Sequence, residues 1–232
     1  NGWRQCGRRP AWQRLLRGSW ACRSTPDRPS SRPAPTTPTR SIQTDFSDLP
    51  ETDDHLREHC ISSEEVYSGK FLHLKKDIVK LPDGNSTYRE YLIHPGAVAI
   101  MPILNDGRIL LERQFRYPVD AAMIEIPAGK LELGEDPLLC AQRELLEETG
   151  YSAKSWEFLG RIHPVISYAT ETIDIYLAKD LTLGECSLDD GEFLDVFAAT
   201  LDEMHAWIAS GKITDVKTII SVYHLARRLK EI

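Results

Sequence analysis

The sequence predicts a mixed α/β domain. Candidate strands lie on both sides of a central helix over residues 136–149, two more helices are expected near 201–210 and 214–230, and no internal repeat is present. The chain has 232 residues, of which 41% are hydrophobic and 27% charged, as in ordinary soluble globular proteins. No apolar run approaches the roughly 18–20 residues of a membrane span, so no membrane segment is expected.

Charge divides the chain into two unlike parts. Residues 1–44 carry nine arginines and one acid, a balance of +8, whereas the rest of the chain carries −15, which gives −7 in total. Residues 1–50 also hold seven of the 14 prolines. Such a composition buries too little apolar surface to offset the entropy of ordering, so residues 1–50 are expected to be a disordered Arg/Pro/Ser-rich extension.

The basic segment leaves two alternatives open. Its arginine-rich, acid-poor composition is also typical of a mitochondrial transit peptide. It could bind nucleic acid, but the acidic remainder of the chain opposes such binding, so no nucleic-acid partner is expected.

The five cysteines are odd in number and lack CxxC spacing, which argues against a disulfide framework or a structural zinc site. They favour a reducing compartment, so we expect a cytoplasmic protein, with the mitochondrion as the alternative if residues 1–44 are a transit peptide.

Residues 51–95 are expected to form a small antiparallel β unit. Apolar residues between 71 and 81 and a β-rich stretch at 87–93 flank Pro82-Asp83-Gly84-Asn85, which is a turn sequence. Residues 96–232 form the main domain, which begins with a nearly unbroken apolar run and a hairpin signal at Asn105-Asp106-Gly107. Its strands are expected at 97–104, 109–111, 123–126, 156–162, 172–178 and 193–199.

The central helix has clear start and stop signals. Glu135-Asp136-Pro137 places acids and a proline in its first turn, and Gly150 follows its end. At about 100° per residue, four leucines gather on one side of this helix. They are expected to form its buried face: Leu138, Leu139, Leu145 and Leu146.

Three glutamates gather on the other side of the helix. Glu144, Glu147 and Glu148 are i, i+3 and i+4 neighbours near the negative end of the helix dipole, so they repel one another. Arg143, four residues before Glu147, relieves only part of this repulsion. A divalent cation would relieve more, because carboxylate oxygens suit Mg²⁺ and Mn²⁺. Without further signals, a cluster of glutamates on a helix is most often a solvated face.

The spacing of residue types from Gly129 to Tyr151 indicates that the glutamate cluster is functional. Gly129 is followed after five residues by Glu135, and after seven more by Arg143-Glu144-Leu145-Leu146-Glu147-Glu148-Thr149-Gly150-Tyr151. This pattern resembles the Nudix box, and only Tyr151 departs from it, standing where an aliphatic residue is usual. The resemblance implies a Nudix α/β/α sandwich with a mixed central sheet, preceded by the small antiparallel β unit.

The resemblance also implies roles for these residues. The reaction would be hydrolysis of a nucleoside diphosphate linked to another moiety, with Mg²⁺, or alternatively Mn²⁺, as the cofactor. Glu144 and Glu148 would be direct metal ligands, Glu147 a further ligand or the holder of a water molecule, and the backbone carbonyl of Ala128 would complete the site. Arg143 would orient the glutamates by ion pairing.

Sequences beside the box narrow the resemblance. Gln114-Phe115-Arg116-Tyr117-Pro118 and Glu125-Ile126-Pro127-Ala128-Gly129 resemble segments of the ADP-ribose pyrophosphatase branch. This branch implies cleavage of ADP-ribose to AMP and ribose 5-phosphate. It implies that Arg116 contacts the diphosphate or a ribose and that Glu125 hydrogen-bonds the base or a ribose. It also implies a homodimer formed through residues 51–95, in which Arg89 reaches the adenine pocket of the partner.

The loop after the box departs from that branch. Related proteins carry a segment like S-P-G-x-x-x-E, whereas this chain has Pro164-Val165-Ile166-Ser167-Tyr168-Ala169-Thr170-Glu171. The resemblance still implies that Glu171 is the general base or an extra metal ligand. The departure leaves other substrates open, namely GDP-sugars and other ADP-sugars. A non-catalytic Nudix ligand sensor is a further alternative, which the complete glutamate set disfavours.

Overall fold

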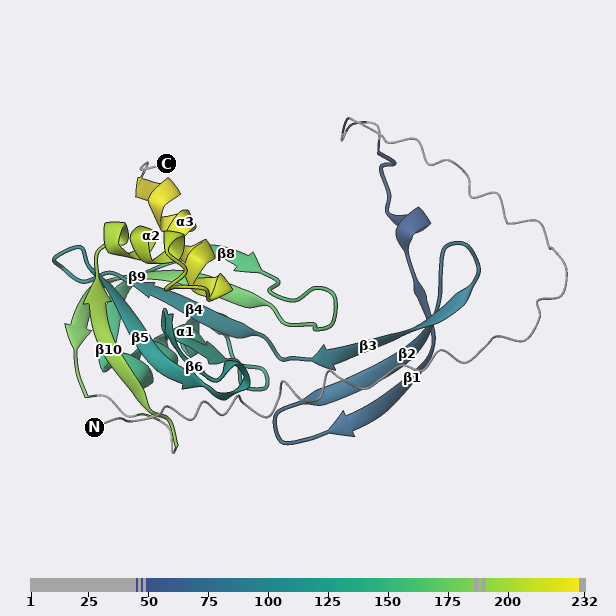
Figure 1. Ribbon diagram of the computed structural model, residues 1–232, viewed down its shortest axis with the longest axis horizontal. Helices are drawn as coiled ribbons and strands as arrows, with labels where there is room; N and C mark the ends of the chain where they lie inside the picture. Colours follow the sequence, from purple (N-terminus) through teal and green to yellow (C-terminus); the bar gives the residue numbers. More distant parts are fainter. Residues whose placement is uncertain (1–44, 46, 48, 186–187, 189–190, 230–232) are drawn as a thin grey trace, which may run out of the picture. The chain divides into compact units, whose positions relative to one another are not determined.

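The computed structural model describes residues 45, 47, 49–185, 188 and 191–229 (Figure 1). Nearly all of the predicted extension over residues 1–50 therefore lies outside the described residues. The strands are β1 His59–Ser68, β2 His73–Lys80, β3 Ser86–Ile93, β4 Ala97–Pro102, β5 Ile109–Arg116, β6 Ala121–Glu125, β7 Ala128–Lys130, β8 Tyr151–Ile162, β9 Ile173–Leu183 and β10 Leu194–Ala199. The helices are α1 Pro137–Thr149, α2 Leu201–Ala209 and α3 Val216–Leu229. None of the described helices is long and apolar enough to cross a membrane.

Strand β4 lies at the centre of a mixed four-stranded sheet with the order β7-β4-β9-β8. It pairs in parallel with β9 and antiparallel with β7, and five of its six residues are buried. This burial is why its sequence is a nearly continuous apolar run. The predicted hairpin after β4 is confirmed, with the amide of Leu104 donating to the Arg108 carbonyl at 2.8 Å. Strands β10, β5 and β6 form a second, antiparallel sheet.

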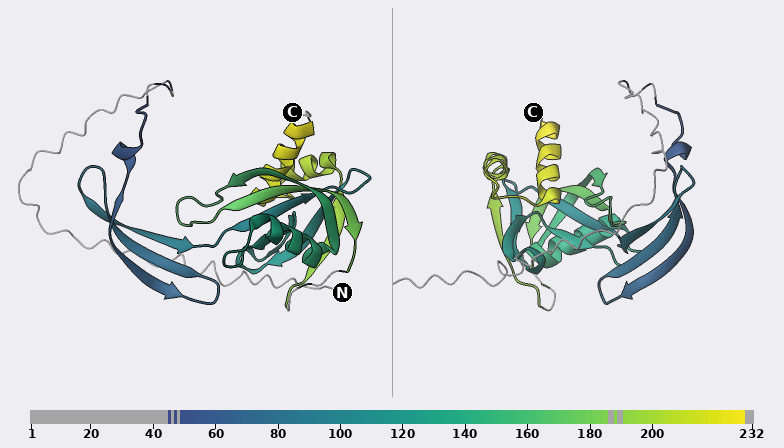
Figure 2. Two further views of the ribbon diagram at one scale, coloured as in Figure 1. Left: turned by 180° about the vertical axis from the view of Figure 1, so that it is seen from behind. Right: turned by 45° about the vertical axis from the view of Figure 1, so that its right-hand side comes forward.

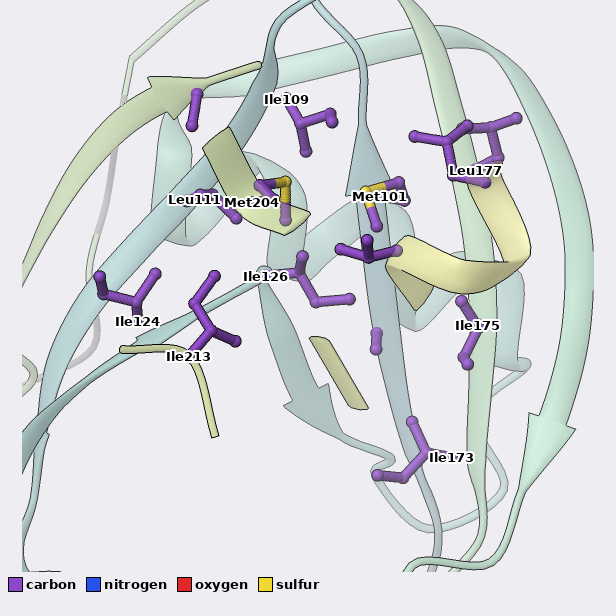
Figure 3. Close-up of a cluster of buried hydrophobic side chains, with 14 residues drawn as sticks. Met101, Ile109, Leu111, Ile124, Ile126, Ile173, Ile175, Leu177, Met204 and Ile213 are labelled. Carbon is purple, nitrogen blue, oxygen red and sulfur yellow. The ribbon is translucent and has the colours of Figure 1, made fainter. Parts of the chain in front are cut away.

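Successive residues of β4 point to opposite faces, and each face has its own hydrophobic core. The core beneath α2 and α3 includes Ala99, Met101, Met204, Val222 and Leu225 (Figure 3). The core beneath α1 includes Val98, Ile100, Cys140, Ala141 and Leu145. Helix α1 and the α2–α3 pair thus cover opposite sides of the strands (Figure 2). The result is a three-layer arrangement of helix, strands and helices.

Strands β1, β2 and β3 form a separate antiparallel sheet, and the predicted turn at residues 82–85 joins β2 to β3. In that turn the amide of Leu81 donates to the Asn85 carbonyl at 2.8 Å, and Gly84 takes a φ of 86°, which suits glycine. Within these three strands only Val79 is buried, and every residue of β1 is exposed. A three-stranded sheet that buries so little surface is marginal by itself.

Helix α1 begins and ends where the sequence predicts. The Asp136 side chain accepts hydrogen bonds from the amides of Leu138 and Leu139, and Gly150 ends the helix with a φ of 72°. The prediction of its buried face was wrong for two leucines, since Leu139 is 59% exposed and Leu146 41% exposed. Small side chains allow the helix to lie close to the sheet, so its buried face consists of Cys140, Ala141, Leu145, Glu148 and Thr149.

The strand predictions differ from the structure chiefly at their ends. Strand β8 begins at Tyr151, directly after α1, instead of at Trp156, and β9 extends to Leu183. Strand β7 was not predicted, because Pro127 and Gly129 are strand-breaking residues. It forms because it pairs with the amino-terminal half of β4, a long-range contact that no local pattern encodes.

Candidate active site

A cavity of about 390 Å³ gathers residues that lie far apart in the sequence. Ala128 and Gly129 line it from β7, Arg116 from the end of β5, and Glu171 from the loop before β9. Lys217 lines the same cavity from the first turn of α3. Because these residues come from four separate elements, only the folded sheet brings them together.

Two glutamates of α1 stand directly behind the cavity wall. The Ala128 amide donates to Glu148 Oε2 at 3.1 Å. Gly129 is required for the approach of Glu144, because a Cβ at residue 129 would lie 1.8 Å from the Glu144 Cδ atom. The Nudix-like glycine therefore makes room for a carboxylate, in addition to any effect on the backbone.

Arg143 holds three carboxylates around one guanidinium. Its Nε and Nη2 donate to Glu135 at 3.0 Å each, and its Nη1 donates to Glu144 at 2.8 Å and Glu147 at 2.9 Å. This paired position holds the pKa of Glu135 low, at about 2, chiefly through the hydrogen bonds from Arg143. Arg143 thus holds Glu135, Glu144 and Glu147 together on the acidic side of α1.

Glu148 lies among buried carboxyl groups that disfavour one another's ionised forms. Glu148 and Glu112, a residue of β5, are only 4% and 3% exposed. Burial is the main cause that raises the pKa of Glu148, and the negative charges of Glu112 and Glu144 raise it further. Burial likewise raises the pKa of Glu112, and the negative charges of Glu192 and Glu125 raise it further. Burial also raises the pKa of Glu144.

The donor set fits a hard divalent cation. Buried carboxylates whose pKa values are raised by one another would be stabilised as anions by a cation between them. Glu112 Oε1 is buried and has no hydrogen-bond partner among the described residues. Within the part of the chain that the structure describes, no three Asp, Glu, His or Cys side chains are already arranged as a metal-ligand set. Arg143 Nη1 binds both Glu144 and Glu147.

The predicted substrate residues separate into two groups. Arg116 lines the cavity and forms a bidentate ion pair with Glu125, with Nε 2.7 Å from Oε1 and Nη2 2.9 Å from Oε2. Glu125 is 4% exposed, so its carboxylate faces this cation beneath the surface. Arg89 lies elsewhere, on β3, where it pairs with Glu58 and donates to the Tyr88 carbonyl. Within one chain, Arg89 does not line the cavity.

Glu171 and His94 line the same cavity. Their charges interact, since the negative charge of Glu171 opposes the burial that lowers the pKa of His94. His94 Nδ1 accepts a hydrogen bond from the Gly96 amide at 3.1 Å, which leaves Nε2 as the protonated ring nitrogen in the neutral form. Phe71 packs edge-on against the His94 ring.

Sequence reasoning missed three residues of this site: Glu112, His94 and Lys217. Glu112 gave a signal, because an acid directly after the apolar residues 109–111 continues a buried strand. Lys217 gave no local signal, since a lysine in the first turn of a helix is ordinarily solvated. Its burial, at 8% exposure, follows from how α3 packs.

Comparison with known families identifies the chain. The family model for the NUDIX domain matches residues 93–219, which include the cavity-lining residues of β4, β7 and α3 and all of α1. The chain belongs to the Nudix family. Members of this family generally depend on a divalent metal ion. In this Nudix protein a second family model, for the nucleoside diphosphate sugar hydrolase N-terminal domain, matches residues 58–92, which are the β1–β3 sheet.

Two curated relatives match this Nudix protein over most of their own length. A methanol dehydrogenase activator from Bacillus methanolicus is 43% identical, over 73% of this chain and 93% of that protein. An ADP-ribose pyrophosphatase from Bacillus subtilis (strain 168) is 39% identical, over 76% of this chain and 95% of that protein. The crystal structure of an ADP compounds hydrolase aligns with a TM-score of 0.69 at 22% identity, covering 76% of this chain and 96% of that one. The predicted Nudix sandwich is thereby confirmed.

Proposed function

We propose that this Nudix protein hydrolyses the diphosphate of a nucleoside diphosphate sugar, with ADP-ribose cleaved to AMP and ribose 5-phosphate. The observation that carries the proposal is the composition of one cavity. Ala128 and Gly129, backed by Glu144 and Glu148, lie in the same cavity as the guanidinium of Arg116. Carboxylates suit a divalent cation and a guanidinium suits a phosphate, so together they match a metal-bound diphosphate.

We propose Mg²⁺ as the cofactor, with Mn²⁺ as the alternative. Glu144, Glu148 and the carbonyl oxygen of Ala128 would hold the cation, with Glu147 as a further ligand. When bound, the cation neutralises phosphate charge and polarises the attacked phosphorus. Arg143 keeps Glu144 and Glu147 on one side of α1, which limits the rearrangement that ligation requires.

The remaining steps fall to residues of the chain. Arg116 would hold a diphosphate oxygen through the edge of its guanidinium that does not face Glu125. Glu171 would accept a proton from the attacking water. The water oxygen forms a bond to one phosphorus as the bridging P–O bond breaks, so the two products are both monophosphates. The charge of Glu171 would interact with His94, which lines the same cavity.

A hydrolysis screen tests this function. Purified full-length protein is incubated with ADP-ribose, other ADP-sugars and GDP-sugars, with Mg²⁺, with Mn²⁺ or with EDTA. We expect AMP and ribose 5-phosphate from ADP-ribose, and no turnover in EDTA. Incorporation of ¹⁸O from labelled water shows which phosphorus is attacked. Turnover in EDTA equal to that with Mg²⁺ would contradict the proposed role of the cation.

The same screen separates the substrate alternatives. The loop 164–171 departs from the pattern of the ADP-ribose pyrophosphatase branch, and it carries Glu171. Preference for a GDP-sugar would place this Nudix protein among hydrolases of other nucleotide sugars. Tight binding of ADP-ribose without turnover would instead favour a ligand sensor.

We also propose a homodimer formed through the β1–β3 sheet. Every residue of β1 is exposed, including Ile61 at 58%, Val66 at 49% and Tyr67 at 57%. Exposed apolar side chains on a sheet with little core of its own favour coverage by a second protein surface. In such a dimer Arg89 would be free to serve the partner's adenine pocket. Light scattering at micromolar concentration tests the state, and a monomer would refute it.

A cytoplasmic location is our final proposal here. The cysteine pattern supports a reducing compartment. A carboxy-terminal fluorescent fusion of the full chain should give diffuse cytoplasmic signal. Signal confined to mitochondria would support the alternative that residues 1–44 act as a transit peptide.

A further inference from the structure

An ionic network extends from the lining of the active-site cavity to a buried carboxylate and joins three elements. At its centre is Glu125, the last residue of β6, which is 4% exposed. Two cations approach its carboxylate: Arg116 from the end of β5, with contacts of 2.7 and 2.9 Å, and Lys217 from the first turn of α3. Sequence separation between Glu125 and Lys217 is 92 residues, so this pairing exists only in the folded chain.

Lys217 is itself fixed from the other side. Its Nζ lies 3.1 Å from Asp215 Oδ2, and that same oxygen accepts from the Thr218 amide at 2.9 Å and the Thr218 hydroxyl at 2.6 Å. The Thr218 hydroxyl oxygen in turn accepts from the Ile126 amide at 3.0 Å. The start of α3 is therefore tied to the residue that directly follows β6, two positions before Ala128.

The orientation of Arg116 follows from this network. Glu125 occupies the Nε–Nη2 edge of the guanidinium, so the Nη1 side is the one available to a ligand in the cavity. The Arg116 side chain is 44% exposed, whereas those of Glu125 and Lys217 are 5% and 11% exposed. The long side chain of Arg116 at the end of β5 is thus held by the buried ion pair of Glu125 and Lys217.

We propose that Glu125 and Lys217 are positioning residues, which fix the guanidinium of Arg116 for the diphosphate of the substrate. This inference rests on the proposed function. It replaces direct contact of Glu125 with a base or ribose, because both Glu125 oxygens already accept from Arg116 or Lys217. Lys217 acts by holding the Glu125 carboxylate between two cations, so that the carboxylate does not rotate toward Arg116 alone.

Steady-state kinetics of Lys217→Met test the inference. We expect KM for the best substrate of the screen to rise roughly tenfold while kcat changes less than about threefold, as for lost ground-state binding. Arg116→Ala should show the same pattern. In the double variant KM should be no higher than in Arg116→Ala, because Lys217 acts through Arg116; independent roles would instead multiply. Lys212→Met is the matched control, since Lys212 lies over the Trp207 ring outside this network.

Two further measurements keep the test decisive. Glu125→Gln/Lys217→Met removes both buried charges together, so it should fold even if Lys217→Met does not, and its KM should still rise. Calorimetric binding of ADP-ribose in EDTA should weaken by a similar factor in each network variant. A KM and a binding affinity equal to those of the wild type in Glu125→Gln/Lys217→Met would overturn the inference. A wild-type protein that hydrolyses no nucleotide sugar would overturn the proposed function instead.

Discussion

At the scale of single residues, the site places charge where stability alone would not. Glu148 lies on the buried face of α1 with Leu145 and Ala141, and it meets Glu112 across the strands. Burying like charges together costs free energy unless a cation joins them. The fold therefore holds a destabilised carboxylate pair at the point where the proposed reaction needs a cation.

Glu148→Gln should separate stability from activity. The amide keeps an acceptor for the Ala128 amide and is always neutral, whereas the raised pKa of Glu148 means that folding must protonate this carboxyl or bury its charge. The metal-free variant should therefore unfold at a temperature a few degrees higher than the wild type, on the order of 1 kcal/mol. Hydrolysis should fall by about a thousandfold, because a metal ligand is lost. Thermal scans in EDTA, repeated with Mg²⁺, measure the first effect. Glu132→Gln, on an exposed loop, is the control. Unchanged turnover in Glu148→Gln would refute the role of Glu148.

Gly129→Ala should act through Glu144. The new Cβ would overlap the end of the Glu144 side chain, which can rotate away, so the fold should survive while the carboxylate leaves its position. We expect activity to fall by more than tenfold, and the Mg²⁺ concentration for half-maximal activity to rise. Gly184→Ala is a matched control, because its Cβ would meet only ordinary contacts, the nearest at 3.4 Å. Wild-type metal dependence in Gly129→Ala would show that Glu144 is not displaced.

At the scale of elements, strand β3 holds the loop that carries Glu171. The Leu92 amide donates to the Tyr168 carbonyl at 2.8 Å, and the Thr170 amide donates to the Leu92 carbonyl at 3.0 Å. The Thr170 hydroxyl oxygen also accepts from the His94 amide at 2.9 Å. The small sheet is thus coupled to the position of the candidate base by backbone hydrogen bonds, whatever else the sheet contacts.

Thr170→Val tests this coupling. Valine matches threonine in shape but removes the acceptor for the His94 amide, which should cost about 1 kcal/mol of unfolding free energy. Because the loop then shifts beside Glu171, kcat should fall roughly tenfold with a smaller change in KM. Chemical denaturation and steady-state kinetics measure the two effects. Thr182→Val, at an exposed position of β9, controls for the substitution itself. A kcat equal to that of the wild type would show that the loop holds without this contact.

At the scale of the whole molecule, the negative charge of the chain affects how an anionic substrate reaches the site. The part of the chain after residue 44 carries a formal charge of −15, and two of its glutamates, Glu148 and Glu144, contact the cavity-lining residues Ala128 and Gly129. An anionic substrate binds such a site more tightly when cations offset this charge. The β1–β3 sheet carries exposed apolar side chains, among them Ile61, Val66 and Tyr67, and we place the dimer contact there.

Ile61→Asp should weaken the proposed dimer. Ile61 is 58% exposed in the single chain, so the substitution costs little within it but places a charge in an apolar contact between copies. We expect light scattering to report monomers at concentrations where the wild type is dimeric, together with a lower unfolding temperature. Ser86→Asp, at an exposed end of β3, is the control. A wild-type mass for Ile61→Asp at all concentrations would exclude a contact at this residue.

Local signals in the sequence determined most of the elements and part of the site. Asp136 and Gly150 delimit α1, the 82–85 turn joins two strands, and the spacing from Gly129 to Glu148 predicts the acidic helix, because each is a relation between neighbours in the chain. Tertiary structure alone decided which face of α1 is buried, and it exposed Leu139. It also buried Lys217 against Glu125, since the burial of a charge depends on contacts between residues distant in sequence, and no local periodicity records them.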